Sequence, residues 1–490
     1  MAFSYLTLPL QQPMLLLWLA AGTFLGIYVG AIPGLSATMA ISLLVSLTYG
    51  WNVYDAVALM TGVYVGAVYG GSRSAILLNI PGAPAAVATG FDGYPLTRKG
   101  QAARAMSAAA VQSVIGTLIG AALLLFGAPI LSRLAGFFRS QDYFLLGVLG
   151  LVTVGSLSGK RLSKGIFSVA LGLFLGCIGM DGMTSVKRFT FGVTWLNSGI
   201  NFIVALIGLF GVSEALIGLR STGCESVRQE LGRILPSFRE TVRHLPLTLW
   251  SSLIGAFTGA LPGAGGDIAA LFAYDSARRT VRHPSAPFGE GAIEGVIAPE
   301  TANNAAIGGA FIPMLTLGIP GDSVTALYIS ALMLAGLEPG PGFLTRSPDI
   351  FGLIVAGLCA AAVFMLVFSL GGVRLFARLA ELPARILIPA VLLISCVGTY
   401  AIRYSMTDVA VMFLFGALGY FLRRGGYPMG PIVLGIVLEG LIETNLRRML
   451  LEAESRVWVA FMNLWQSPLS VTLLILTLAL PLGGRLMRRK

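Results

Sequence analysis

Four Pro-Gly pairs interrupt otherwise apolar stretches of this 490-residue sequence, and polar side chains surround them. A proline inside a helix removes one backbone hydrogen bond and clashes with the preceding turn. Backbone groups freed in this way persist in lipid only where protein or a water-filled cavity surrounds them. A helix that restarts after a break presents free N–H groups and a partial positive charge to an anion, and unwound carbonyl oxygens can hold a cation. The breaks therefore predict a binding site for a small charged solute; they lie at Pro33-Gly34, Pro81-Gly82, Pro262-Gly263 and Pro320-Gly321.

Two sets of residues beside the breaks are candidate ligands. For the anionic groups of a solute, the candidates are Gly34, Ser36, Ser72, Arg73, Asn79, Gly82, Gly263, Asn303, Asn304 and Gly321. For a coupling cation, either Na⁺ or H⁺, the candidates are Thr38, Asp267, Asp322 and Thr325. A charge at membrane depth usually faces a cavity or a partner, which favours a cation site at Asp267 or Asp322. Capping of the next half-helix remains the alternative for both aspartates, because Asp is a preferred N-cap residue.

Two motifs recur in the same order on either side of a polar middle segment: residues 30–38 and 78–82 in the first half, and 259–267 and 317–321 in the second. This order predicts an internal duplication. Paired interruptions in repeated halves are typical of transporter binding sites. For any single Pro-Gly pair, a simple kink or close helix packing would explain the residues equally well.

Composition places the chain in a membrane. The sequence is 56% hydrophobic and 11% charged, with a mean hydropathy of +0.83. A soluble domain carries about 25% charged residues, so lipid must cover much of this surface. The net charge of +11 comes from short basic clusters between apolar stretches, which fits cytoplasmic loops rather than a groove for nucleic acid. With two histidines, no C-x-x-C spacing and no paired catalytic motif, we expect no metal site beyond Na⁺, no cofactor and no enzymatic activity.

The apolar stretches predict an all-α polytopic membrane protein with about 10–14 membrane segments. They lie near residues 14–32, 53–79, 105–130, 142–158, 165–180, 196–219, 246–261, 305–318, 322–337, 350–377, 384–401, 406–422, 426–441 and 468–484. We expect two repeats, 1–220 and 246–490, inverted relative to each other, in which the Pro-Gly pairs break helices or form re-entrant hairpins. The polar segment 221–245 reads as a cytoplasmic linker or a short amphipathic helix on the membrane. The basic residues 488–490 predict a cytoplasmic C-terminus.

Longer blocks of sequence, at residues 69–72, 75–82, 92–95, 155–160, 188–192, 261–265, 291–305 and 315–321, carry a resemblance to a known family. They resemble the large membrane subunit of the tripartite tricarboxylate transporter family (TctA type), over nearly the whole chain. The resemblance implies a secondary transporter of the bacterial cytoplasmic (inner) membrane that imports small carboxylates such as citrate, driven by a cation gradient. It also implies two partners, a small membrane subunit and a periplasmic solute-binding protein. Alternating access, of elevator type, is an expectation by analogy.

Two positions depart from the family's usual pattern. Arg73 stands where an uncharged residue is more common, and Ala83 stands where an acidic residue is common. A guanidinium can grip a carboxylate with two hydrogen bonds, so Arg73 is a candidate solute ligand. An internal ion pair is the equally weighted alternative. Both departures leave the identity of the carboxylate open.

The alternative to a tripartite transporter is a permease that works without a binding protein. Its sequence would look similar. A channel is disfavoured, because the polar residues gather at the breaks and do not form a continuous stripe along a pore.

Overall fold

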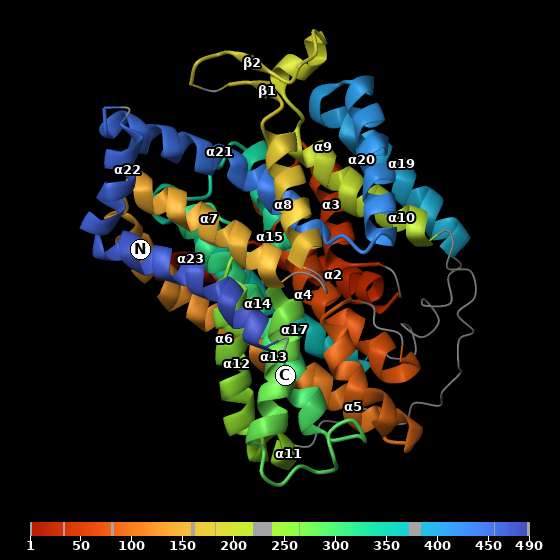
Figure 1. Ribbon diagram of the computed structural model, residues 1–490. Coiled ribbons are helices and arrows are strands. Elements are labelled where there is room, and N and C mark those ends of the chain that lie inside the picture. The colour runs from red at the N-terminus through yellow and green to blue at the C-terminus, as the bar shows by residue number, and fades with distance from the viewer. Residues whose placement is uncertain are drawn as a thin grey trace.

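Figure 1 shows the computed structural model of the chain, a large assembly of helices with one small β-hairpin. The structure describes residues 2–32, 35–79, 83–157, 162–181, 183–218, 238–263, 265–371, 384–454 and 456–487. The predicted ligands Gly34 and Gly82 lie outside the described residues, as do residues 221–237 of the predicted linker.

The elements follow one another in two series. The first series is η1 (Ala2–Thr7), α1 (Leu8–Gln11), α2 (Pro13–Ala31), α3 (Ala37–Leu47), α4 (Val53–Leu78), α5 (Ala86–Arg98), α6 (Ala102–Ala135), α7 (Ser140–Leu157), α8 (Leu162–Gly176), β1 (Gly179–Met180), β2 (Lys187–Arg188), η2 (Thr194–Ser198), α9 (Phe202–Leu206), the π-helical turn η3 (Ile207–Val212) and α10 (Ser213–Gly218). The second series is α11 (Phe238–Arg243), α12 (Leu245–Ala260), α13 (Gly265–Thr280), α14 (Glu294–Leu317), α15 (Ser323–Leu334), α16 (Phe343–Arg346), α17 (Pro348–Gly371), α19 (Ala384–Arg403), α20 (Met406–Arg424), α21 (Met429–Glu452), α22 (Val457–Asn463), η4 (Leu464–Gln466) and α23 (Pro468–Met487).

Among the described residues, six helices are long and apolar enough to cross a membrane unaided: α2, α4, α6, α17, α20 and α21. The bent pair α22 and α23 adds a seventh if it forms one span. Shorter apolar helices, including α3, α8, α12 and α15, supply further segments. The chain is therefore an all-α polytopic membrane protein, as predicted.

Helix α14 begins earlier than the sequence suggested. We expected a membrane segment near 305–318, but the helix starts at Glu294 and includes the polar run to Asn304. Every residue of α14 except Ile312 is buried. Its polar side chains bond to neighbouring helices; the Asn304 amide, for example, donates to Thr117 of α6 at 3.0 Å. A polar sequence forms a helix at this depth because the surrounding protein, rather than lipid, satisfies it.

Glycines set the closest helix contacts. Helices α2 and α4 cross through Gly22, Gly26 and Gly30 on one side and Gly62, Gly66 and Gly70 on the other. A Cβ at Gly66 would lie 2.3 Å from the carbonyl oxygen of Thr23. Helices α12 and α14 meet in the same way, since a Cβ at Gly259 would lie 2.3 Å from the carbonyl oxygen of Ala306. Small residues allow this approach, which is how helices associate without a hydrophobic driving force in lipid.

Contacts between the two series follow a reciprocal pattern. Helix α6 of the first series packs along α14 of the second, and α17 of the second packs along α4 of the first. In the same way α3 contacts α15, and α13 contacts α5. A duplicated chain would produce this exchange, because α2–α6 and α12–α17 carry the matching sequence motifs. The repeat itself and the predicted boundaries 1–220, 221–245 and 246–490 remain predictions.

The strands β1 and β2 form an antiparallel hairpin that projects from the helices at the opposite end from α11 (Figure 1). Asp181 closes the hairpin by accepting hydrogen bonds from the N–H groups of Thr184 and Met183. These bonds, together with the guanidinium of Arg447, lower the pKa of the Asp181 carboxyl below its ordinary value. The hairpin is thereby tied to α21, which carries Arg447.

Candidate solute site at the helix breaks

The four half-helices that follow the Pro-Gly pairs, α3, α5, α13 and α15, all begin at one cavity. The cavity has a volume of about 120 Å³, enough for several water molecules. First-turn or preceding residues of each half-helix line it: Ser36, Ala37 and Thr38 for α3; Ala83, Pro84 and Ala85 for α5; Gly265, Gly266 and Asp267 for α13; Asp322, Ser323 and Val324 for α15. Helices α4 and α14 supply Tyr64, Ala67, Val68, Asn303 and Ile307, and Gly263 completes the lining. Residues of both series thus form a single site.

The helices that lead into two of the breaks end in the same way. Asn79 follows α4 with φ +55° and Gly318 follows α14 with φ +73°, both in the left-handed conformation. This conformation ends a helix, and Gly and Asn adopt it at the lowest cost. The two residues occupy matching positions in the recurring motif.

Asp322 caps α15 and also reaches across to the first series. Its carboxylate accepts a hydrogen bond from the N–H of Thr325, while the Thr325 hydroxyl accepts from the N–H of Asp322, which completes a capping box. The other carboxylate oxygen accepts from the hydroxyl of Tyr64 on α4. The capping interpretation therefore holds for Asp322, and Thr325 serves the cap rather than lining the cavity.

Asp267 links the two series at a second helix start. Its carboxylate accepts a hydrogen bond at 3.1 Å from the N–H of Ala85, the N-cap residue of α5. The negative charge therefore lies at the positive end of a half-helix in the other series. Together Asp267 and Asp322 place two carboxylates beside one small cavity.

Glycines bring α13 close to its neighbours. Gly263 and Gly265 have φ values of +72° and +56°, which suit glycine. A Cβ at Gly265 would lie 2.7 Å from the Cβ of Asp322, and one at Gly266 would lie 2.2 Å from Oδ1 of Asn303. A side chain at position 265 would therefore clash with Asp322, and one at position 266 would displace either the Asn303 side chain or the first turn of α13.

The structure brings together six of the predicted ligands at the cavity: Ser36, Thr38, Gly263, Asp267, Asn303 and Asp322. Ser36 acts as the N-cap of α3, because its hydroxyl accepts from the N–H of Met39 at 3.1 Å. The other candidates that the structure describes do not line the cavity. Asn304 bonds to Thr117 of α6, Asn79 forms the end of α4, and Gly321 packs against the backbone of Gly259.

Ser72 and Arg73 also lie away from the residues that line the cavity. The guanidinium of Arg73 lies 5.9 Å from the centroid of the Tyr69 ring, and the side chain is only 5% exposed. Ser72 donates a hydrogen bond at 2.5 Å to the carboxylate of Glu300 on α14. In this conformation of the protein, neither side chain is in place to bind a solute in the cavity.

Several residues that line the cavity are not among the predicted ligands, and Tyr64, Gly265 and Gly266 are three of them. Tyr64 carries no local signal, since its bond to Asp322 joins residues 258 positions apart. The paired Gly265 and Gly266 had a signal, because two adjacent glycines, separated from Pro262-Gly263 in the sequence by one alanine, indicate close approach of the backbone to a neighbour.

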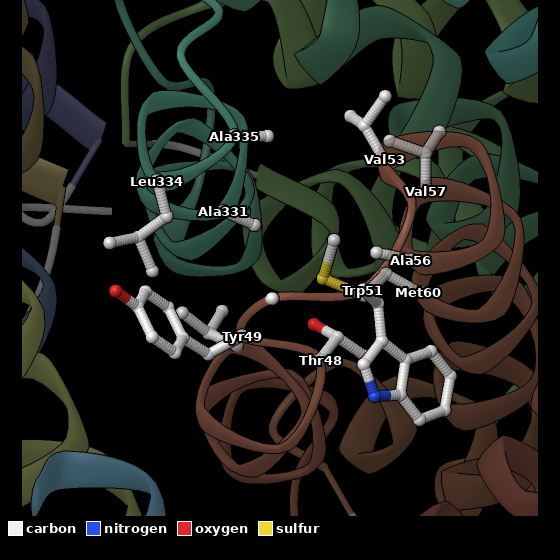
Figure 2. Close-up of a pocket in the computed structure, with 12 residues that line it drawn as sticks. Thr48, Tyr49, Trp51, Val53, Ala56, Val57, Met60, Ala331, Leu334 and Ala335 are labelled. Carbon is white, nitrogen blue, oxygen red and sulfur yellow. The ribbon is translucent and has the colours of Figure 1, made fainter. Parts of the chain in front are cut away.

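A second pocket, of about 90 Å³, lies between the end of α15 and the connection from α3 to α4. Figure 2 shows Tyr49 beside Leu334 on one side of it and Trp51 beside Met60 on the other. No charged residue lines it, and the hydroxyl of Thr48 is committed to the carbonyl oxygen of Leu44. It lacks the groups that would recognise a charged solute.

Broken helices that meet at a polar cavity define a multi-pass membrane protein of the transporter type. The comparison with known families names the type: residues 16–434 match the tripartite tricarboxylate transporter TctA family, and the chain belongs to it. The TctA family is a family of transporter subunits, not of enzymes.

Two relatives come from Agrobacterium vitis. One, an uncharacterised 52.8 kDa protein in the TAR-I ttuC′ 3′ region, is 35% identical over 468 residues, covering 95% of this chain and 92% of the relative. The other, an uncharacterised protein in the TAR-II ttuC′ 3′ region, is 38% identical over 220 residues, covering 45% of this chain and 89% of the relative. No solved structure matches the chain.

Proposed function

We propose that the chain imports small di- or tricarboxylates as the large subunit of a tripartite transporter, driven by a Na⁺ or H⁺ gradient. A periplasmic solute-binding protein delivers the solute, and a small membrane subunit completes the complex. The complex lies in the bacterial cytoplasmic membrane, with segment 221–245 and the C-terminus on the cytoplasmic side. Membership of the TctA family supports the assembly, and the basic clusters support the orientation.

The convergence of four helix N-termini on one cavity is the observation that carries the proposal. Each N-terminus contributes unsatisfied N–H groups and roughly half a positive charge. Aspartate carboxylates already occupy the starts of α5 and α15. The start of α3 carries a neutral serine cap. Helix α13 begins with Gly265 and Gly266, and Asp267 of its first turn bonds to Ala85 of α5 instead, so the carboxylates of the solute would bind at the starts of α3 and α13.

The two aspartates of the cavity are suited to bind the coupling cation. Asp267 and Asp322 both line the cavity, so their negative charges repel an incoming carboxylate unless a cation is bound with it. Binding of the cation and the solute would then be mutually dependent, which is what coupling requires.

Uptake into proteoliposomes tests the proposal. The chain and its small membrane subunit would be reconstituted with or without the binding protein, and labelled citrate, tartrate, malate and succinate offered under an imposed Na⁺ or pH gradient. Gradient-driven uptake that depends on the binding protein is expected. Uptake without it would favour the stand-alone permease, and no uptake of any carboxylate by folded complex would contradict the proposal.

Substitution of Gly266 by Ala tests the position of the solute. The added Cβ would meet Oδ1 of Asn303 at 2.2 Å, so the first turn of α13 or the Asn303 side chain must move. We expect the KM for the carboxylate to rise about tenfold, equivalent to roughly 1.4 kcal/mol. Gly90→Ala on α5 is the matched control, because its Cβ would meet no atom closer than 3.7 Å. An unchanged KM in G266A would show that the start of α13 is not part of the solute site.

A further inference from the structure

A buried carboxyl group lies one helical turn from the cavity and forms no part of its lining. Glu300 of α14 is fully buried, with a relative exposure of 0%. Three hydroxyl groups from three different helices surround its carboxylate: Ser72 of α4 and Thr89 of α5 donate to Oε1, each at 2.5 Å, and Ser113 of α6 donates to Oε2 at 3.0 Å. We call these four residues the Glu300 cluster.

The cluster is connected to the cavity through the helices that form it. On α14, Glu300 precedes the cavity residue Asn303 by three positions. On α5, Thr89 follows the cavity residue Ala85 by four positions, and on α4, Ser72 follows Val68 by four. Three or four residues make about one turn, or roughly 5.4 Å. Glu300 therefore lies about one helical turn from the cavity along each of three helices.

No basic side chain among the described residues pairs with Glu300; its bonding partners are hydroxyl groups alone. A permanently ionised carboxylate in that setting would be very costly inside a membrane. The cluster can hold a proton without rearranging, because a hydroxyl both donates and accepts hydrogen bonds. When Oε2 carries the proton, it donates to Ser113, while Ser72 and Thr89 continue to donate to Oε1.

Other charged and titratable groups on the surrounding helices have bonds of their own. On α4, Arg73 lies over Tyr69, and the phenol of Tyr69 is within electrostatic reach of Glu300. Asp92 of α5 accepts hydrogen bonds from backbone N–H groups at 289, 291 and 292 and from the hydroxyl of Tyr274 of α13. At the ends of α12 and α14, His244 pairs with Glu294 at 3.2 Å.

Two further acids are those of the cavity. Asp267 of α13 accepts from the N–H of Ala85, and Asp322 of α15 caps its own helix and accepts from Tyr64. Both accept a backbone N–H at the start of a half-helix, where the helix carries a partial positive charge. Glu300 has no such support, so it differs from them in having neutral hydroxyl donors only.

We propose that Glu300 carries the transported proton, and that the Glu300 cluster is a proton-binding site distinct from the carboxylate cavity. This rests on the proposed function and selects H⁺ as the coupling ion. Thr89 lies on half-helix α5, whose N-cap also touches Asp267. A change in the charge of Glu300 therefore acts on the same half-helix that borders the solute site. This shared helix links binding of the proton to binding of the carboxylate.

The test compares wild type, Glu300→Gln and Glu300→Asp in proteoliposomes that contain the complete transporter. Two assays are made with each: exchange of labelled for unlabelled carboxylate at equal pH on both sides, and accumulation driven by an imposed pH gradient. Gln keeps the size and an acceptor oxygen but cannot titrate. We expect E300Q to exchange at no less than about half the wild-type rate while its gradient-driven accumulation falls at least about tenfold.

Each other outcome has a defined meaning. Accumulation by E300Q equal to wild type under a pH gradient would overturn the proposal, as would loss of exchange along with accumulation in folded E300Q. Accumulation by wild type under a Na⁺ gradient but not a pH gradient would overturn it in favour of the aspartates of the cavity. Absence of both exchange and accumulation in wild type would instead refute the proposed function.

Glu300→Asp keeps the proposal testable if E300Q does not fold. Its carboxyl is one methylene shorter, so its distances to the three hydroxyls must change. We expect E300D to accumulate the carboxylate with a shifted pH profile while exchange at equal pH persists. A pH profile identical to that of wild type would show that the carboxyl at position 300 is not the group that titrates.

Discussion

Replacement of Gly66 by Ile is expected to abolish recovery of folded protein. The Cβ at this position would lie 2.3 Å from the carbonyl oxygen of Thr23 and 2.9 Å from the nitrogen of Ile27, both on the backbone of α2. A backbone cannot swing aside as a side chain does, so α2 and α4 must separate. Overpacking a well-filled interior costs about 1–3 kcal/mol even where side chains can adjust. Folded yield is measured by size-exclusion chromatography in detergent, and thermal stability on whatever protein remains.

Gly440→Ala on α21 is the matched control. A Cβ there would meet no atom within 4 Å, and Ala is favoured over Gly in a helix by about 1 kcal/mol. G440A should therefore be recovered at wild-type levels. Normal recovery of G66I would show that the contact between α2 and α4 is not needed for the fold.

Asp322→Asn is expected to leave the fold intact and to lower carboxylate uptake about tenfold or more. Asn is as good an N-cap as Asp, so α15 keeps its first turn. The change removes one negative charge from the cavity and replaces the charge-assisted bond to Tyr64, which is worth roughly 1.5–3 kcal/mol, with a weaker neutral one. Initial rates of uptake in proteoliposomes, corrected for the amount of folded protein, measure the effect.

A second Tyr–Asp pair in the same protein provides the comparison. Tyr54 at the start of α4 donates to Asp349 in the first turn of α17, away from the residues that line the cavity. Asp349→Asn should therefore disturb a similar bond without changing the solute site. Equal losses of uptake in D322N and D349N would show that both aspartates act only through stability.

The Pro and Gly residues in the sequence predict where the helices are interrupted. The half-helices expected to start near residues 34, 82, 263 and 321 begin three, four, two and two residues later, at Ala37, Ala86, Gly265 and Ser323. Pro and Gly act through their own backbones, so their effect on a helix does not depend on distant residues. The left-handed ends at Asn79 and Gly318 follow from the same local chemistry.

Interactions between distant parts of the chain could not be predicted in this way. The stretch 294–304 appeared too polar for a membrane helix, yet it forms the first half of α14, because Ser72, Thr89 and Ser113 satisfy Glu300. These partners are 187 to 228 positions away. For the same reason Asn304, predicted as a solute ligand from its motif, lies at a helix contact instead.

The burial of α14 has a consequence for how the protein is made. This helix is not among those apolar enough to cross a membrane alone, so the translocon should release it poorly into free lipid. Synthesis runs from the N-terminus, and α6, which carries Ser113 and Thr117, is complete before α14 emerges from the ribosome. The first half of the chain would thus provide the polar template onto which the centre of the second half is inserted.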